Sequence, residues 1–504
     1  MNTQRPRPRV AIVGSGPAGF GVLTGLLEHA PHADVTLFDH GSAPEQPLLP
    51  PGDASTHVQP LYDEIYRSIW QSQRRVFPPP KTHFGRTLPK HRIEGKERIF
   101  RSEALGGLSN FWGATCLPFT QRELRNWPLQ RESLAPHYRS VAERIGISGR
   151  HDVLNEYFGD DYVNRPPMQT TATVQHLERV VNEHSDVNDP WRVVAGINRC
   201  AVETRRKATN HCIACGECLA GCVRDSIFSS RQQFAAQIAT GNIRHVKAKV
   251  RSIDAAARTL HVLQEEQATE TGSFHRIYLA AGCPNSTEIV MRSFGLTRVS
   301  AMADNAVYVF PILYLGRGDG SAANYLSLTN SILGLLPQQP GLEFAQAQVY
   351  TNFDYMWRYN LPPGLWPLAR SLVRWSRDRL LWGRLYMPGA ASQSYGLEMR
   401  EDSLQFNYAQ AADVAAAKRA MGFVRKTLNH GGFYVPPAPL VHQKSNTHYA
   451  STLPYGGTHL DVAADGQIAP GVYLCDSSVF PDLPAVSLTF TIMANAHRTA
   501  MESL

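Results

Sequence analysis

The sequence predicts an α/β protein, α+β overall, that is built from two lobes. Residues 9–39 read as a strand, a glycine-rich turn, a helix and a second strand. Residues 276–290 repeat the order of strand, glycine and helix, and residues 306–315 read as a strand in a region that mixes strands with helices. With 504 residues, 43% of them hydrophobic, the chain is long enough to bury the cores of two lobes.

Composition excludes several classes of protein. No run of about 18 uncharged apolar residues occurs, so no membrane-spanning helix is predicted. The N-terminal segment MNTQRPRPRV has no signal-peptide core, which predicts a cytoplasmic protein. The net charge of +7 is spread along the chain without a nucleic-acid motif, so no nucleic acid partner is expected. The eight cysteines are expected to form no disulfides in a reducing compartment.

The N-terminal strand RVAIV is followed by GSGPAG, which has G-x-G-x-x-G spacing. Gly14 permits the tight turn, Gly16 lets the backbone approach a pyrophosphate, and Gly19 lets the helix pack on the strand. The N–H groups at the helix start then face the phosphates. Asp39 ends the second strand, where a carboxylate can accept hydrogen bonds from a ribose. These features predict a Rossmann-type lobe that binds either NAD or FAD.

Four further segments resemble the glucose–methanol–choline (GMC) family of oxidoreductases. They are SEALGGLSNFWGA, RIYLAAGCPNSTEIV, NTHYASTLPYGG and GVYLCDSSVFPDLPAVSLTFTIMANAHR. The resemblance implies FAD, stretched between an FAD-binding lobe and a substrate-binding lobe built on a mixed or antiparallel sheet with helices. The expected FAD-binding lobe comprises residues 1–124, 200–300 and 445–504, and the substrate-binding or cap lobe comprises residues 125–199 and 301–444.

The resemblance also assigns residues to the cofactor. The stretch along the flavin needs glycine because only glycine lets the backbone lie close to a planar ring. Phe111 precedes the tryptophan where some members carry a histidine that attaches FAD, so non-covalent FAD is expected. The cofactor-binding residues implied beyond the N-terminal motif are Gly106, Gly107, Ser109, Asn110, Trp112, Gly113, Val250 at the adenine, Ala281, Gly282, Asp476 and Thr489.

Two positions correspond to the family's catalytic pair. His448 matches the histidine of the H-x-x-G-T-x-x-M-G pattern, although Ser451 and Tyr455 depart from it. A histidine suits proton removal from an alcohol because its pKa lies near working pH. Ser487 stands where a second histidine or asparagine is usual, and serine is a poor base at neutral pH. The base is therefore His448 alone, or His448 with a group from elsewhere.

A cysteine-rich loop at residues 211–223 contains the sequence CIACGECLAGC. Its C-x2-C-x2-C-x3-C spacing is typical of iron–sulfur ligands, and Gly216 and Gly221 would help the chain curl around a cluster. The alternatives are a loop without metal and, last, zinc, which favours C-x2-C pairs separated by a longer loop. The expected cluster is 4Fe–4S or 3Fe–4S, with Cys200 as another candidate for the fourth ligand; the run itself supplies Cys212, Cys215, Cys218 and Cys222.

Residues 365–386 combine leucines and tryptophans with five arginines. Such a stretch can lie in a membrane interface, which would be a peripheral membrane contact. The alternative is a lid or subunit-contact helix whose apolar face is buried. Near the predicted base, His442, Lys444, Asn446 and Tyr449 could bind the hydroxyls of a sugar-like or aminosugar-like substrate.

These features predict an FAD-dependent dehydrogenase that oxidises an alcohol by hydride transfer to flavin N5. The expected partners are a small-molecule alcohol and a protein or quinone electron acceptor, with the cluster as a relay. Two alternatives stay open. One is a lyase or isomerase that keeps FAD as a scaffold, favoured by Ser487 at the second catalytic position. The other is an electron-transfer subunit with no substrate of its own.

Overall fold

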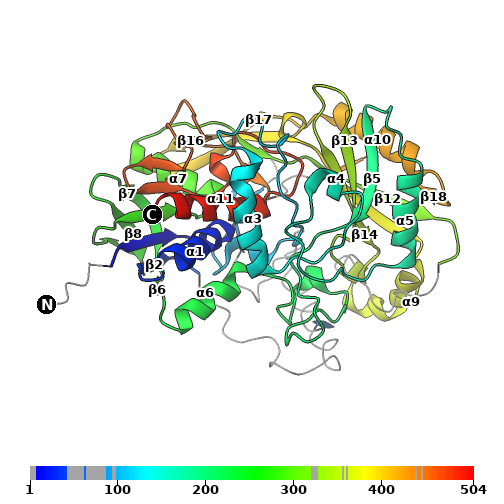
Figure 1. Cartoon of the computed structure of the whole chain (residues 1–504), viewed down its shortest axis with the longest axis horizontal. Helices are drawn as coiled ribbons and strands as arrows, with labels where there is room; N and C mark the ends of the chain where they lie inside the picture. The colour runs from blue at the N-terminus through cyan, green and yellow to red at the C-terminus, as the bar shows by residue number, and fades with distance from the viewer. Residues whose placement is uncertain are drawn as a thin grey trace.

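The computed structural model describes residues 7–41, 62–63, 87–92, 98–318, 327–354, 357–358, 361–437, 440–443 and 447–504. The elements divide between two sides of the molecule (Figure 1). One side holds both termini and the parallel sheet, and the other holds a large antiparallel sheet. The predicted α/β class with an antiparallel second lobe is confirmed.

The parallel sheet has six strands in the order β21-β22-β10-β1-β2-β6. β1 lies at its centre between β2 and β10, and all but the first residue of β1 are buried. A strand covered on both faces needs this continuous apolar run. β21 alone is antiparallel, to β22. The strands are β1 (Arg9–Val13), β2 (Asp34–Phe38), β6 (Arg244–Val246), β10 (Arg276–Leu279), β21 (Gln467–Ala469) and β22 (Val472–Leu474).

Helices at both ends of the chain pack together beside this sheet. α1 (Pro17–His29) lies against α11 (Thr489–Glu502), and Gly21 permits the close approach because a Cβ there would lie 2.2 Å from the Met493 carbonyl oxygen. α3 (Arg131–Ile145) packs on the same helix. The first and last helices of the chain therefore pack against each other beside the parallel sheet. α6 (Ser230–Ala239) and α7 (Cys283–Phe294) complete this side, with the meander β7 (Lys249–Asp254), β8 (Thr259–Gln264) and β9 (Gln267–Glu270).

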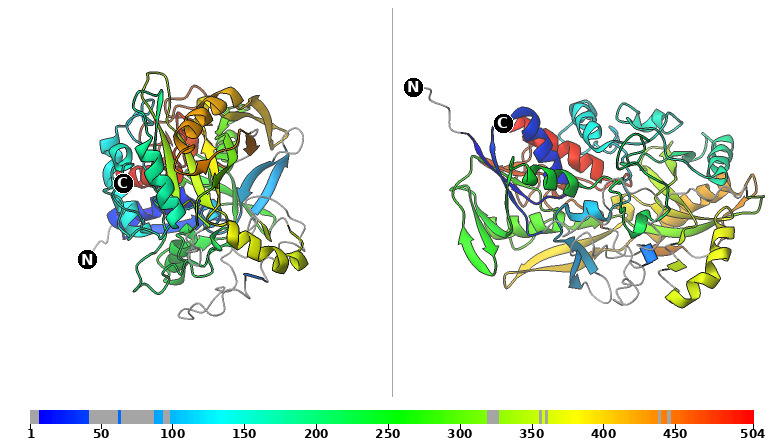
Figure 2. Two further views of the ribbon diagram at one scale, coloured as in Figure 1. Left: turned by 90° about the vertical axis from the view of Figure 1, so that its right-hand side faces the viewer. Right: turned by 90° about the horizontal axis from the view of Figure 1, so that it is seen from below.

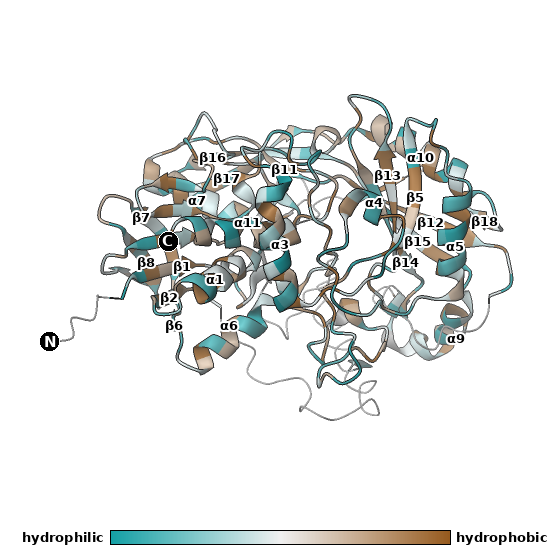
Figure 3. Cartoon of the chain, in the orientation of Figure 1, coloured by the Kyte–Doolittle hydropathy of each residue, from teal (hydrophilic) through white to brown (hydrophobic). Residues whose placement is uncertain are grey.

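The antiparallel sheet forms the second lobe. Its order is β18-β12-β15-β14-β13-β5, with β19 also paired to β12. α5 (Ala172–Glu183) and α10 (Val414–Leu428) cover it, and Figure 3 shows hydrophobic colour on the strands and hydrophilic colour on the outer side of α5. The strands are β5 (Trp191–Ile197), β12 (Val307–Tyr314), β13 (Ser331–Pro337), β14 (Ala345–Thr351), β15 (Leu380–Tyr386), β18 (Phe433–Tyr434) and β19 (Val441–Gln443).

A four-stranded sheet, ordered β17-β16-β11-β20, connects the two sides. Its hairpin is tied to the parallel-sheet side by ion pairs of Asp402 with Arg251 and Arg292. The strands are β11 (Met302–Asp304), β16 (Gln393–Arg400), β17 (Ser403–Gln410) and β20 (Tyr449–Ala450); β3 (Thr87–Arg92) and β4 (Arg98–Ser102) form a separate hairpin.

The hydrophobic cores do not follow the expected lobe boundaries everywhere. Residues of α3, the short helix α4 (Asn155–Phe158) and the chain up to Met168 pack in the core of the parallel sheet. The hairpin of β16 and β17 contributes Leu397, Leu404 and Phe406 to that same core. The family resemblance placed these segments in the substrate-binding lobe, and that division of the chain into lobes stays a prediction.

The basic stretch at residues 365–386 is two elements rather than one amphipathic segment. The helix α9 (Trp366–Ser376) is followed by strand β15, which lies inside the antiparallel sheet. Leu368 is 79% exposed and Leu372 is 65% exposed, so the apolar face of α9 is not buried within this chain, and a role as a lid or subunit-contact helix stays a prediction. Among the helices of the described residues, none is long and apolar enough to cross a bilayer.

Candidate active site

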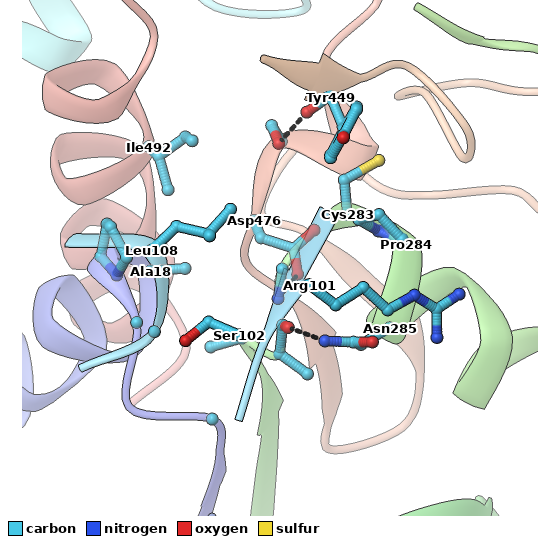
Figure 4. A pocket seen from close by; sticks show the side chains of 18 of the residues that line it. Ala18, Arg101, Ser102, Leu108, Cys283, Pro284, Asn285, Tyr449, Asp476 and Ile492 are labelled. Carbon is cyan, nitrogen blue, oxygen red and sulfur yellow. Dashed lines mark hydrogen bonds between the residues drawn. The ribbon is translucent and has the colours of Figure 1, made fainter. Parts of the chain in front are cut away.

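A cleft with about 860 Å³ of empty space opens where β1 and β10 end. Figure 4 shows its close surroundings, with α1 and α11 on one side and α7 on the other. The carboxyl ends of parallel strands are the usual ligand position in such sheets. Of the predicted residues, the cleft is lined by Gly14, Gly16, Asp39, Gly107, Ala281, Gly282, His448, Tyr449, Asp476 and Thr489.

The predicted glycine turn has the geometry that a pyrophosphate requires. Gly14 has φ +100°, and a Cβ there would lie 2.6 Å from the Ala280 carbonyl oxygen. A Cβ on Gly16 or Gly282 would meet no atom within 4 Å, so the space beside both residues is open. α1 begins after Gly16 without a side-chain cap, which leaves its first N–H groups for a ligand. Gly19 packs instead, since its Cβ would lie 2.1 Å from the Gly14 carbonyl oxygen.

Asp39, which follows β2, is hydrogen-bonded to the glycine turn that follows β1. Its Oδ2 accepts hydrogen bonds from the Ser15 backbone N–H at 2.8 Å and from Ser15 Oγ at 2.7 Å, and its Oδ1 accepts from Gly41 N at 2.7 Å. Burial raises the pKa of this carboxyl, while the hydrogen bonds from Ser15 and Gly41 oppose that rise. A carboxylate has about four acceptor positions, so capacity for a ribose hydroxyl remains.

A second cavity of about 730 Å³ continues from the first. Val250 on β7 lines it, as do Lys249 and Ile289. The two cavities have six lining residues in common, so together they form one long cleft from Val250 to His448. Those residues are Gly14, Asp39, Arg101, Ser102, Ala281 and Asn285. The glycine turn, the acceptor at Asp39 and the length of this cleft fit an FAD.

The GGLSNFWG segment lines the cleft through Gly107, and its other polar groups form hydrogen bonds that hold the segment in place. Gly106 N donates to Ser15 Oγ at 2.7 Å, and Ser109 Oγ donates to the Gly106 carbonyl at 2.6 Å. Asn110 Nδ2 donates to Leu105 O, and Trp112 Nε1 donates to Phe228 O. The turn is thus held by its own polar side chains. Flavin contact by Gly106, Ser109, Asn110, Trp112 and Gly113 stays a prediction.

Asp476 organises the other wall of the cleft. Its Oδ2 accepts from Gly282 N at 2.9 Å and from Ser286 Oγ at 2.5 Å, while its Oδ1 accepts from both the N–H and the hydroxyl of Ser478. Burial raises the pKa of this carboxyl, and the hydrogen bonds from Ser286 and Ser478 oppose the rise. Asp476 therefore fixes Gly282, whose backbone borders the cleft.

His448 lies at the far end of the cleft, and its tautomer is set by Asn305. His448 Nδ1 lies 2.9 Å from Asn305 Oδ1. The amide of Asn305 donates through Nδ2 to the carbonyls of Met387 and Pro484, at 2.9 and 3.1 Å, so its oxygen is the acceptor for the imidazole. Nδ1 must then carry the proton, and Nε2 keeps a lone pair.

The surroundings of His448 keep the imidazole neutral. Burial, and secondarily the positive charge of Arg384, lowers its pKa to about 4. The Tyr386 ring stacks on it with centroids 5.5 Å apart. Two residues close to His448 have a backbone in the left-handed region. Thr447, just before it, has φ 64°, and Ser451, three residues after it, has φ 74°. Such conformations cost energy in non-glycine residues and cluster at functional sites. The lowered pKa leaves the imidazole unprotonated at neutral pH, so Nε2 is able to accept a proton, although as a weaker base than the histidine of ordinary pKa that the sequence predicts.

Ser487 belongs to a buried polar layer on the antiparallel sheet. Gln348 Nε2 donates to Ser487 Oγ at 3.4 Å, and Tyr350 donates to Gln348 Oε1 at 2.9 Å. Gln346 donates to the Ala485 carbonyl, while its buried Oε1 has no hydrogen-bond partner among the described residues. Nothing in this arrangement turns the Ser487 hydroxyl into a base.

Several other polar residues make contacts within the chain or lie outside the described residues. On α11, Asn495 bonds to Tyr455, and His497 bonds to Glu28 at 2.9 Å. His442 contacts Gln393 at 3.3 Å. Lys444 and Asn446 lie outside the described residues.

The cysteine-rich loop curls as expected, with positive φ at Ala214, Gly216 and Gly221. Cys212 Sγ accepts from Ala214 N at 3.4 Å, and Cys222 Sγ accepts from Ser226 N at 3.2 Å. Burial raises the pKa of Cys212, Cys215 and Cys218 to about 12, which favours neutral thiols. Within the described ranges, no three His, Cys, Asp or Glu side chains are arranged to hold a metal. Iron–sulfur ligation by these cysteines stays a prediction.

Comparison by sequence finds no relative. No protein-family model matches the chain. No curated protein matches it either.

Comparison by structure finds matches over the whole chain. Pyridoxine 4-oxidase from Mesorbium loti superposes with a TM-score of 0.63 and 13% identity over 98% of this chain and 99% of its own. Formate oxidase from Aspergillus oryzae RIB40 superposes with a TM-score of 0.63 and 13% identity over 99% and 98%. The chain has the fold of GMC oxidoreductases. An FAD-dependent oxidoreductase from Chaetomium thermophilum also shares this fold, with a TM-score of 0.60 at 13% identity over 98% of both chains. The predicted resemblance is confirmed at the level of the fold.

Sequence reasoning missed the residues that surround His448. Asn305 precedes strand β12, and Arg384 and Tyr386 belong to β15, so all three are distant from His448 in sequence. Alternation of apolar and polar residues in LLWGRLY marks a strand, but no sequence signal shows that its polar face meets His448. Asn305 is an ordinary polar residue before a strand, and only the fold reveals its contact.

Proposed function

We propose that the protein is an FAD-dependent oxidoreductase that oxidises an alcohol. The observation that carries this proposal is the neutral His448, whose Nε2 lone pair is defined by Asn305, at the end of a cleft suited to FAD. Bound FAD supplies the hydride acceptor. The cleft residues would hold it through the turn at Gly14, the acceptor at Asp39 and the open backbone at Gly282.

The chain's own part in the reaction is proton removal and positioning. His448 Nε2 accepts the hydroxyl proton of the alcohol, and Nδ1–H stays bonded to Asn305 Oδ1. After His448 accepts the proton, its imidazolium carries a positive charge. The positive charge of Arg384, which lowers the imidazole pKa, disfavours this state. The proton must therefore pass onward as the carbonyl product forms. Ser487 serves to bind rather than to act as a base.

The proposed substrate is a small molecule with several hydroxyls, such as a sugar or aminosugar. The support is the buried polar layer of Gln346, Gln348, Tyr350 and Ser487, in which the Oε1 of Gln346 has no hydrogen-bond partner among the described residues. Polar groups of this kind discriminate strongly in favour of substrates that satisfy them. An apolar alcohol would leave the Oε1 of Gln346 without a hydrogen bond, at a cost of roughly 1–3 kcal/mol.

An iron–sulfur relay to a protein or quinone acceptor is proposed separately, as is a cytoplasmic location. The relay rests on the spacing of Cys212, Cys215, Cys218 and Cys222 and on the two N–H···S bonds in the loop. No step of the proposed reaction uses the relay. Iron and acid-labile sulfide analysis of anaerobically purified protein decides the matter. Absence of both from protein made with ample iron would remove the relay.

The test of the main proposal is anaerobic mixing of the FAD-loaded protein with a panel of sugars, aminosugars and simple alcohols. Loss of oxidised-flavin absorbance with one of them is expected. His448→Ala should slow that reduction by about 10²–10⁴-fold, the usual contribution of a general base. A lyase would turn over substrate while the flavin stays oxidised. An electron-transfer subunit would be reduced only by a redox partner.

A further inference from the structure

Helix α9 has an apolar stripe that is exposed to solvent. Leu365, Leu368, Leu372 and Trp375 follow the spacing i, i+3, i+7 and i+10, which places them on one face of a helix. They are 48%, 79%, 65% and 59% exposed. Val373 is the buried residue of the helix. Figure 2 shows α9, in yellow, at the periphery of the antiparallel-sheet lobe. A surface helix normally buries such a stripe against its own domain.

The stripe is flanked by positive charge, and α9 itself contains no acid. Arg370 and Arg374 are exposed on the helix, and residues 366–376 contain no Asp or Glu. Arg379 lies over the Trp375 ring at 4.7 Å. The nearest acids in sequence, Asp354 and Asp378, are buried, and Asp354 is paired with Arg377. The surface of α9 is therefore both apolar and cationic.

We propose that α9 docks on an anionic lipid bilayer surface. The leucines and Trp375 would enter the boundary between headgroups and acyl chains, where tryptophan is enriched. The arginines would contact anionic headgroups while their stems lie along the apolar stripe. A second copy of this chain is a poor occupant, because a two-fold contact would bring Arg370 and Arg374 of both copies together. The inference does not depend on the proposed redox activity.

The test is flotation of the full-length, FAD-loaded protein with phosphatidylcholine vesicles, with and without phosphatidylglycerol. The protein is expected to float with the anionic vesicles and to remain below with the neutral ones. Arg370→Gln/Arg374→Gln should weaken the partition by roughly thirty-fold, from about 1 kcal/mol for each arginine. Leu368→Ser/Leu372→Ser should abolish it. These side chains are exposed, so both variants should keep the wild-type melting temperature.

Matched controls separate docking from general charge or hydrophobicity. Val187→Ser removes a 59% exposed apolar residue elsewhere, and Arg206→Gln/Lys207→Gln removes two exposed charges from another loop. Both should float like the wild type. Equal flotation of the α9 variants and the wild type would overturn the proposal. So would absence of binding to anionic vesicles, or a concentration-dependent dimer that Leu368→Ser/Leu372→Ser dissolves, since the stripe would then be covered by a second copy.

Discussion

Replacement of Asn305 by aspartate should shift the acid limb of the pH–activity profile, where activity falls as His448 is protonated, to higher pH. The carboxylate would keep the acceptor that lies 2.9 Å from His448 Nδ1, and it would add a negative charge there. An opposite charge this close raises an imidazole pKa by about 1–3 units. The pKa of His448 is about 4 in the native protein because of burial and Arg384. The limb near pH 4 should therefore move to about pH 5–7.

The assay is kcat/KM against pH for the alcohol that reduces the flavin best. Asn305→Ala should lower kcat by on the order of a hundred-fold through misplacement of the imidazole. In a His448→Ala background the same change should have little further effect, because Asn305 acts through the imidazole. An unmoved acid limb in Asn305→Asp, or additive losses in the double variant, would refute the positioning role. Thermal melting of each variant controls for misfolding, since Asn305 also binds two backbone carbonyls.

Three further outcomes follow from the same geometry. Gly14→Ala should yield protein without FAD, because the Cβ would meet the Ala280 carbonyl at 2.6 Å and φ is +100°; flavin retained in the purified variant would contradict this. Ser487→Ala should lower kcat/KM by less than about tenfold, the effect of one hydrogen bond to substrate, whereas a hundred-fold loss would assign Ser487 to the chemistry. In the folded protein the pKa values of His137 and His448 are lowered to about 4 from 6.5. As the pH falls, these histidines are therefore protonated in the unfolded chain before they are protonated in the folded protein. The free energy of unfolding should accordingly fall as pH drops from 6.5 towards 4, and urea denaturation that is independent of pH in this window would contradict the lowered pKa values.

Local sequence predicted the parts of the fold in which each residue's role is set by its neighbours in the chain. The turn after RVAIV, the acid at Asp39 and the glycine at 282 appear where expected because backbone geometry dictates those residue types. The residues around His448 could not be predicted, since Asn305 and Tyr386 meet it where β11 and β20 of one sheet approach β15 of another. The division of residues 365–386 into a helix and a strand was not predicted, because arginines and leucines suit both an exposed helix and a strand.

Anaerobic reduction of the flavin in wild-type and His448→Ala proteins tests the central claim most directly. Both proteins should retain FAD, because His448 borders only one end of the long cleft. With a hydroxyl-rich substrate the wild-type flavin should lose its oxidised absorbance, and the variant should do so about 10²–10⁴-fold more slowly. Equal rates in the two proteins, or a wild-type flavin that stays oxidised while substrate is consumed, would contradict the account.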